Sequence, residues 1–521
     1  MADARRGRGL DARDRTHTPS ASPHSLDSAA RRLHRCRLHL SLVLTSALFL
    51  GAAVPVVASA QCPNGSPPPC ARQAARAPSV AILFMEPRSR NAADSLLAEG
   101  LTLEIISTLS GVARLDVRSR WASRRIAADA DPVRAARALG VDYLVDGVLE
   151  LDSARVLVHG ALTRTSTGRV VRSIRIERRR SEIEALQMAV AQEVAAAVVG
   201  QLLPAERARF AVRRVDPRAV EFTLRSRAMN ELGTIAANRQ GIAYARQAIE
   251  IDSTYAPAWA RLSVAYGLRV GLVADSTIAY RDLAVEASEQ ALALDSANGT
   301  AMSVIASVRA MENDLSPRTE ALARQGAAQE PGVTTGTILA VVLHFRGKVE
   351  EALAVSRAVV RRDSLAPVAW SYAAGRFFQA RRFAEAVGAR EHALALRLSR
   401  SDSVSLLNAR RWARLEAGDC AGALAEGRSA DNAMLVIESL RCLERTSEAD
   451  SVIDSRLALS TIPPENRAIL LAWRGLPDSA FSVLDHAFPW SLGWTLQHPA
   501  FAPYRQHPAY LALRRRMGLE Q

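Results

Sequence analysis

The sequence is short of lysine, because Lys348 is the only lysine among its 67 basic residues. The formal net charge of +14 therefore comes almost entirely from arginine, a bias that a GC-rich genome produces without selection for phosphate binding. Residues 1–39 contain nine arginines and four aspartates and so contribute part of this net charge. No extended stripe of alternating basic and aromatic residues accompanies the charge, as it would on a surface that stacks bases. We therefore interpret the charge as solvated surface rather than a nucleic-acid or anionic-lipid site, and we expect no nucleic-acid partner.

Aromatic residues are also few, at 5% of a chain that is 49% hydrophobic. Alanine and leucine carry most of the apolar content, which favours close-packed helices over a β-sandwich rich in valine, tyrosine and tryptophan. The 521 residues suffice for two or three domains, or for one domain and a solenoid.

The sequence has no recognisable catalytic motif. A Gly-rich phosphate loop with lysine, a zinc helix with two histidines and a Gly-x-Ser-x-Gly elbow do not occur in it. The adjacent acids Glu350 and Glu351 fit the solvated end of a helix better than a catalytic pair. Cysteines do not cluster with histidine at metal-ligand spacing. We expect no enzymatic activity, no cofactor and no metal site.

The amino-terminal segment, residues 1–60, has the order of a bacterial export signal. Four arginines between positions 31 and 37 precede an apolar run over residues 38–58, and small residues follow up to Ala60. We predict cleavage between Ala60 and Gln61, which places the mature protein in the periplasm or otherwise outside the cytoplasm. The alternative is an uncleaved anchor, since about 20 apolar residues just span a bilayer. A lipoprotein is disfavoured because Gln61, not a small residue, precedes Cys62.

Five cysteines are present, and Cys36 lies in the targeting segment. In an oxidising compartment the other four are easily paired. Cys62 and Cys70 enclose a Pro-rich stretch in the linker, residues 61–77, and are our first disulfide candidates, with two free thiols as the alternative. Cys420 and Cys442 could bridge neighbouring helices.

Residues 78–202 predict a small mixed α/β domain. A short apolar run from residue 79 to 84 indicates a buried strand, and apolar residues then recur at helical spacing from residue 96 to 109. A short alternating stretch at 113–119 predicts a second strand, and a second helix follows over 132–139 behind the cap residue Asp131. Three strand-like stretches lie at 143–149, 155–163 and 170–177, with a turn at 165–168, before a long helix from residue 181. This order predicts a mixed sheet covered by helices.

Three segments of this region, residues 80–84, 98–106 and 138–147, resemble the TolB-like amino-terminal domain. That family commonly precedes tetratricopeptide arrays in bacterial regulators and in cyclase-like or kinase-linked proteins. The resemblance implies no catalytic residue. The segment Phe84–Pro87 departs from the family pattern at the end of the first strand.

The region from residue 217 to 486 contains a repeat. Helix-ending Asp-Ser pairs recur at Asp252, Asp295 and Asp363, and the last two are 68 residues apart, twice 34. The stretches 255–259 and 365–370 both continue into Ala-Pro and end in tryptophan. Positions Ala352 and Ala386, again 34 apart, open second helices.

This pattern resembles the tetratricopeptide family, whose helical hairpins stack because a single hairpin cannot bury its apolar face. We expect six or seven hairpins, with a longer loop or helix near residues 271–276, and a concave groove. Another α-α solenoid family is the alternative. The aromatic and Pro-rich residues 487–521 predict a cap over the last hairpin, with a small aromatic ligand pocket as the alternative.

The fold class we predict is mainly α, with a small α/β domain followed by a tetratricopeptide-like solenoid. Its function is then that of a non-enzymatic, extracytoplasmic scaffold that binds other proteins or peptides in the groove. The alternative is an envelope sensor in which the α/β domain binds a ligand or partner.

Overall fold

The computed structural model describes residues 76–89, 91–212, 214–272, 277–396, 400–485 and 489–519. The predicted signal segment, its cleavage site at Ala60 and Gln61, the apolar run 38–58 and the pair Cys62 and Cys70 lie outside the described residues. Among the helices of the described ranges, none combines the length and apolar character that a membrane span requires.

A mixed sheet flanked by helices forms the first part, as predicted. Its order is β3-β1-β4-β5-β6, with β1 parallel to β3 and β4, and with β5 antiparallel to both β4 and β6. The short strand β2 also pairs with β4. The elements are β1 (Ser79–Ile82), β2 (Glu86–Pro87), α1 (Ala92–Ser110), β3 (Asp116–Val117), α2 (Arg120–Ala127), α3 (Pro132–Ala138), β4 (Tyr143–Leu151), β5 (Arg155–Arg164), β6 (Arg169–Arg179), the 3-10 turn η1 (Arg180–Glu182), α4 (Ile183–Val199) and α5 (Pro204–Ala208).

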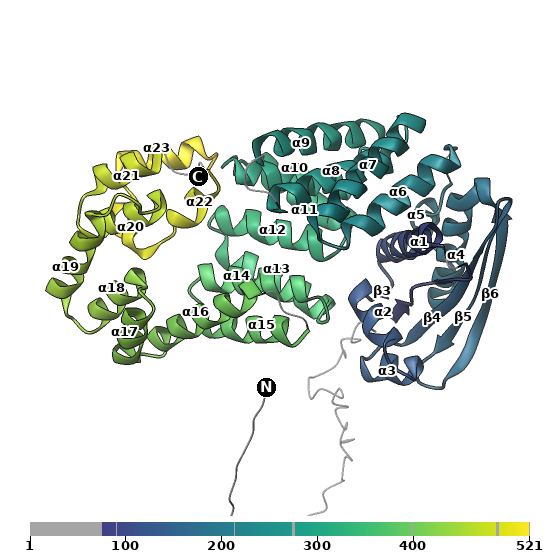
Figure 1. Cartoon of the computed structure of the whole chain (residues 1–521), viewed down its shortest axis with the longest axis horizontal. Coiled ribbons are helices and arrows are strands. Elements are labelled where there is room, and N and C mark those ends of the chain that lie inside the picture. Colours follow the sequence, from purple (N-terminus) through teal and green to yellow (C-terminus); the bar gives the residue numbers. More distant parts are fainter. Residues whose placement is uncertain are drawn as a thin grey trace, which may run out of the picture. The chain divides into compact units, whose positions relative to one another are not determined.

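The sheet has helices on both faces (Figure 1). On one face Leu101 of α1 and Val190 of α4 are fully buried against the strands. On the other, Ile126 of α2 and Ala136 of α3 pack on the beginning of β4. The sequence did not predict α2, because its two large apolar residues, Trp121 and Ile126, are five positions apart and do not repeat at helical spacing, and its arginines are typical of a surface segment.

The helical array follows with sixteen helices among the described residues, which pair in chain order into eight hairpins rather than the six or seven expected. The shorter hairpins near the carboxyl end lack the repeat motif that reveals the others. The helices are α6 (Pro217–Asn230), α7 (Ile235–Ile251), α8 (Ala256–Leu272), α9 (Thr277–Leu294), α10 (Gly299–Met311), α11 (Pro317–Gln329), α12 (Val333–Phe345), α13 (Val349–Arg362), α14 (Pro367–Gln379), α15 (Phe383–Leu396), α16 (Arg400–Glu416), α17 (Cys420–Ser429), α18 (Ala433–Cys442), α19 (Thr446–Leu457), α20 (Pro464–Trp473) and α21 (Pro477–Asp485).

The repeat motif forms the same type of turn, closed by a tryptophan hydrogen bond, at two places. The indole N–H of Trp259, in α8, donates to the backbone carbonyl of Ser253 at 2.9 Å. The indole N–H of Trp370, in α14, donates in the same way to Ser364 at 2.8 Å. The tryptophan therefore locks the turn that precedes its own helix. The 43-residue interval after Asp252 is taken up by longer helices, since α8 and α9 have 17 and 18 residues.

The α/β domain and the array share one core. Val220 and Leu224 of α6 belong to the same buried cluster as α1 and the sheet. A Cβ atom on Gly100 would lie 2.3 Å from the carbonyl oxygen of Leu224, so only glycine allows α1 this close to α6. The α/β domain thus covers the apolar end that an uncapped solenoid would expose.

An ion-pair cluster adds to this junction. Glu104 of α1 lies 2.5 Å from Arg227 of α6 and 3.7 Å from Arg261 of α8. Burial opposes ionisation, but the two guanidinium groups hold the pKa of Glu104 below its ordinary value. The carboxylate therefore stays charged and ties α1 to two helices of the array.

The carboxyl-terminal segment consists of α22 (Pro489–Thr495), the 3-10 helix η3 (Pro499–Tyr504) and α23 (Pro508–Arg516). It packs on α20 and α21, where Phe481, Phe501 and Tyr510 are buried together. These aromatic side chains fill a core rather than line an open pocket.

The same segment also reaches the middle of the array, a contact that the sequence did not predict. α22 lies beside α12 (Figure 1), and a Cβ atom on Gly493 would lie 2.9 Å from the Phe345 side chain. The backbone N–H of Leu315 donates to the carbonyl of Met517 at 2.8 Å. Next to this bond, Glu320 of α11 pairs with Arg346 at 2.5 Å and with Lys348 at 2.6 Å. The array is therefore closed on itself between α10 to α12 and the carboxyl-terminal segment.

Candidate binding surface

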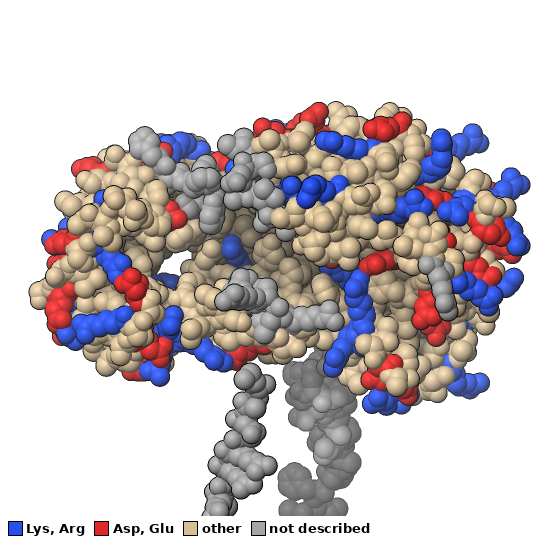
Figure 2. Space-filling view, in the orientation of Figure 1, with Lys and Arg blue, Asp and Glu red and all other residues tan. Residues whose placement is uncertain are grey.

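The first helices of successive hairpins lie in a row. α6 contacts α8, α8 contacts α10, α10 contacts α12 and α12 contacts α14. Such a row gives the array one continuous surface on one side of the hairpins. Figure 2 shows the molecule hollowed beside the middle hairpins of this row.

A shallow hollow lies between α12, α13 and α14. Small side chains line it, so the helix backbones approach closely and the hollow is not filled: Ala340, Ala369 and Ala373. Gly336 of α12 allows the approach, since a Cβ atom there would lie 2.5 Å from a methyl group of Val359. We call the face of α12 and α14 around this hollow the inner surface.

One face of α14 supplies the side chains that stand on the inner surface. Val368, Tyr372 and Arg376 follow at steps of four residues and therefore share a face of the helix. Val368 is 38% exposed and Tyr372 is 51% exposed, so both offer apolar surface beside the hollow. Tyr372 and Arg376 both line the hollow.

Arg376 is the notable charge here because it has no carboxylate partner among the described residues. Its Nε and Nη1 atoms are buried and make no hydrogen bond in the described part of the chain. The guanidinium carbon lies 5.5 Å from the centre of the Phe345 ring, so a cation–π contact holds it. Burial lowers its pKa to about 10, which leaves the group positively charged at neutral pH. Unsatisfied guanidinium donors of this kind favour a carboxylate or a similar anion.

The neighbouring histidine adds no charge. His344, at the end of α12, is 1% exposed. Burial, with a smaller contribution from Arg376, lowers its pKa to about 3, so the imidazole is neutral at physiological pH. Arg376 is thus the cation of the inner surface.

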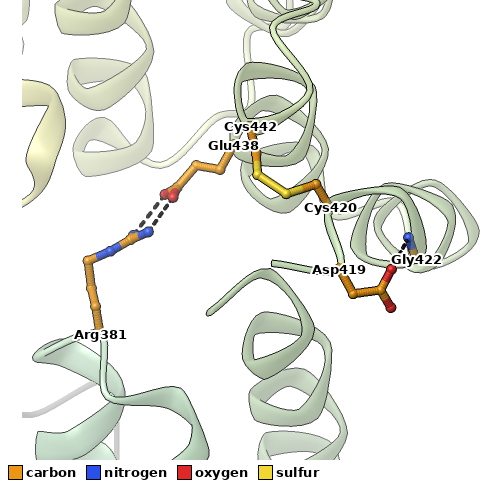
Figure 3. Close-up of a disulfide and its surroundings, with 6 residues drawn as sticks. All are labelled: Arg381, Asp419, Cys420, Gly422, Glu438 and Cys442. Carbon is orange, nitrogen blue, oxygen red and sulfur yellow. Dashed lines mark hydrogen bonds and ion pairs between the residues drawn. A yellow bond between two sulfur atoms is a disulfide. The ribbon is translucent and has the colours of Figure 1, made fainter. Parts of the chain in front are cut away.

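A second group of polar residues lies where the array closes. Arg381, in the turn after α14, donates two hydrogen bonds to the carboxylate of Glu438 in α18, one of them at 2.9 Å (Figure 3). His498, after α22, lies 3.6 Å from the same carboxylate. The side-chain amide of Gln497 donates to the carbonyl of His344 at 2.7 Å. We call Arg381, Glu438, Gln497 and His498 the closure network.

The electrostatics of Glu438 show that this network is ionic. Burial raises the pKa of the carboxyl group, but the hydrogen bonds from His498 and Arg381 outweigh it and hold the pKa below its ordinary value. The carboxylate is therefore ionised at neutral pH and binds the turn after α14 to the carboxyl-terminal segment.

The disulfide between Cys420 and Cys442 joins α17 to α18, which confirms that these cysteines bridge neighbouring helices (Figure 3). Asp419 caps α17 by accepting from the N–H of Gly422 at 2.9 Å. Glu438 lies one turn before Cys442 on α18. The disulfide thus fixes the helix that carries the central acid of the closure network.

Glu351, one of the two adjacent acids noted in the sequence, has a structural partner. Glu351 pairs with Arg324 at 2.6 Å in the first turn of α13, beside Glu350. Within the described ranges, no group of three or more His, Cys, Asp or Glu side chains is arranged to hold a metal ion. Sequence reasoning missed both Arg376 and the closure network, since neither belongs to a motif.

The fold defines a mainly helical protein with a small mixed α/β domain ahead of a tetratricopeptide-like solenoid. No protein-family model matches the chain. A curated protein of Rhizobium meliloti (strain 1021), named "Putative adenylate cyclase 3", is 30% identical over 204 residues, which make up 38% of this chain and 34% of that protein. The chain spans about a third of the length of this relative.

Solved structures with a similar fold include "YrrB: a TPR protein with an unusual peptide-binding site", at 16% identity and a TM-score of 0.26 over 37% of this chain and 92% of that one. PilF of Pseudomonas aeruginosa matches at 14% identity and a TM-score of 0.27, over 53% of this chain and 95% of its own. The human IFIT1 dimer with m7Gppp-AAAA matches at 9% identity and a TM-score of 0.38, over 78% and 98%. Likeness at these identities concerns the fold alone.

Proposed function

We propose that this protein is a non-enzymatic scaffold that binds a segment of another protein on the inner surface. The observation that carries the proposal is Arg376, a charged guanidinium that lines an alanine-rich hollow and has no carboxylate partner among the described residues. A side-chain carboxylate or a chain-terminal carboxylate fits this guanidinium, and Val368 and Tyr372 offer apolar contact beside it.

We further propose that the scaffold works outside the cytoplasm. The disulfide between Cys420 and Cys442 supports this location, because disulfides persist in oxidising compartments and are rare in the cytosol. The signal-like order of residues 1–60 supports the same location.

The similarity to a protein named as an adenylate cyclase concerns only a third of that protein, so it does not carry the activity to this chain. We expect the purified full-length protein to form no cyclic AMP from ATP. Formation of cyclic AMP above the level of a blank would overturn the non-enzymatic part of the proposal.

A sensor is the second candidate, and one contact favours it. Ser119, just before α2, donates to the side chain of Asp363 at the end of α13, and Trp121 packs against the α13 and α14 cluster. The α/β domain therefore contacts the array at α6 and again beside the inner surface. A ligand of that domain would act on the array through Asp363, so in a sensor Trp121→Ala would change the affinity for the partner. In a plain scaffold Trp121→Ala would leave that affinity unchanged.

Site-specific photocrosslinking tests the scaffold. A benzoylphenylalanine at Tyr372 is expected to form a discrete adduct in intact cells, whereas one at Leu459, an equally exposed residue after α19, is not. The adduct at Tyr372 should fade with Arg376→Gln but persist with Arg361→Gln, which removes an exposed arginine on α13. Equal adducts at both positions, or no effect of Arg376→Gln, would contradict the proposal.

A further inference from the structure

The sheet of the α/β domain ends in a long edge strand. β6 runs for 11 residues, pairs with β5 on one side and pairs with no other strand of the described residues. Nearly all of its side chains are exposed, including Val170 at 56% and Val171 at 42%. An edge of this length offers a row of backbone N–H and C=O groups to another strand.

The pairing of β6 with β5 is regular over most of its length, although the Glu177 carbonyl already accepts from the Arg178 guanidinium and the Arg179 N–H already donates to Glu182. The register with β5 shifts at Val171, so a bulge separates the first two residues of β6 from the rest. The stretch Arg172–Arg179 then pairs regularly with Leu162–Arg155. Eight residues match the length of an ordinary strand in a globular protein.

The charge of this edge is strongly one-sided. β6 carries five arginines and a single acid, Glu177, which already pairs with Arg155 of β5 at 3.0 Å. Arg172 pairs with Glu193 of α4. Four arginines of β6 have no ion pair with any described residue: Arg169, Arg175, Arg178 and Arg179. Basic side chains protrude from the part of the surface where β6 lies (Figure 2).

We propose that β6 is a strand-addition site for an extended, acidic segment of a partner protein. The backbone edge would supply ladder hydrogen bonds, and the guanidinium groups that have no ion pair among the described residues would pair with carboxylates on the added strand. This site is separate from the inner surface, and the proposal goes beyond the function proposed for that surface.

A second copy of this chain does not fit the edge. An antiparallel pairing of β6 with itself would bring together two strands that each carry five arginines and one acid, and this excess of like charge destabilises the strand pair. A nucleic acid or an anionic membrane would satisfy the charges, but neither offers the alternating N–H and C=O groups that the strand edge requires. The acidic strand is the occupant that uses both features.

The direct test uses the full-length protein and a capped decapeptide in which glutamate and valine alternate. We expect this peptide to bind, and we expect a decapeptide of alternating lysine and valine not to bind, by fluorescence anisotropy at physiological ionic strength. A third peptide carries the glutamate sequence with N-methyl groups on alternate residues, which removes backbone donors and keeps every charge. Loss of binding with this peptide supports strand addition, and unchanged binding would overturn it.

Charge reversal identifies the site. The triple variant Arg175→Glu, Arg178→Glu and Arg179→Glu should weaken binding of the glutamate peptide by about tenfold or more. A matched variant reverses three exposed arginines of the array that form no ion pair with a described residue, Arg239→Glu, Arg318→Glu and Arg361→Glu, and should bind like the wild type.

The comparison of N-methylated and plain peptides on the wild type keeps the test decisive if the triple variant fails to fold. Equal weakening by both triple variants would show a response to net charge alone and would overturn the proposal. Tighter binding of vesicles rich in phosphatidylglycerol, or of single-stranded RNA, than of the glutamate peptide would assign the edge to another class of partner and overturn it as well. Failure at β6 leaves the Tyr372 crosslink unaffected, so the two proposals are separable.

Discussion

Arg381 and Glu438 face each other across the closure of the array, although three helices, α15, α16 and α17, separate them along the chain (Figure 3). The pair joins the turn after α14 to α18, and His498 connects α18 to the carboxyl-terminal segment. Ion pairs and charged hydrogen bonds between the turns therefore stabilise the second half of the array, in addition to the packing between its helices.

Replacing Glu438 with glutamine should destabilise the protein by about 1–3 kcal/mol at pH 7, because it removes charge-assisted hydrogen bonds in a largely buried place. The folded pKa of Glu438 lies below the unfolded value, so its contribution is complete above about pH 4.3 and is lost as the pH falls through the folded pKa. Urea unfolding at pH 7 and at pH 3 should thus show a smaller difference between variant and wild type at the lower pH. A constant difference would argue against an ionic role.

His344 predicts a second dependence on acid. Its folded pKa of about 3 lies far below its unfolded value, so the unfolded chain binds one more proton between about pH 3 and pH 6.5. Stability contributed by the neutral imidazole is therefore lost as the pH falls below 6.5. Unfolding free energies measured from pH 7.5 to 5 should fall more steeply for the wild type than for His344→Leu. Parallel curves would show that His344 does not stay neutral.

Gly100 tests the junction between the α/β domain and the array. In Gly100→Ala the new Cβ meets the Leu224 carbonyl, and relieving this overlap should cost about 1–3 kcal/mol. Gly388→Ala, in α15, is the control, since no atom lies within 4 Å of its Cβ position and helix propensity favours alanine by about 0.5–1 kcal/mol. Thermal unfolding should move down for the first variant and slightly up for the second.

The disulfide can be tested by removal. Cys420 and Cys442 are 22 residues apart, and opening a loop of this size costs roughly 3 kcal/mol in the chain-entropy account. The double variant Cys420→Ser and Cys442→Ser should unfold at a lower temperature, and dithiothreitol should lower the midpoint of the wild type only. Free thiols at both positions in protein taken from its native compartment would contradict the extracytoplasmic proposal.

Local features of the fold could be predicted from the sequence. Two patterns reflect contacts between residues that are close along the chain. One is the alternation of strands and helices before residue 203, and the other is the recurrence of Asp-Ser with a following tryptophan. The structure confirms the second pattern at Trp259 and Trp370. The cap of the helix after Asp131 is confirmed for the same reason, since Asp131 accepts from the N–H of Arg134 three residues on.

The closure of the array and the candidate binding surface could not be predicted in this way. Gln497 and His344 are 153 residues apart, and no period or motif relates them. Arg376 is one arginine among many in the sequence, and its isolation from carboxylates appears only once α12 and α14 are packed together. The structure has eight hairpins among the described residues, and the sequence predicted six or seven. The short helices near the carboxyl end are stabilised mainly by packing against their neighbours, so their sequences carry only a weak repeat pattern.

The single lysine has a practical consequence. Lys348 carries the one side-chain amine of the chain, and its side chain is 45% exposed. Lys348 and Arg346 both pair with Glu320. Arg346 also donates to the carbonyl of Leu315, whose own N–H donates to Met517 at the seam, the contact between the array and the carboxyl-terminal segment. An amine-reactive fluorophore should therefore label the folded protein beside that seam with little competition. Such a dye would report directly whether the array opens when a partner binds.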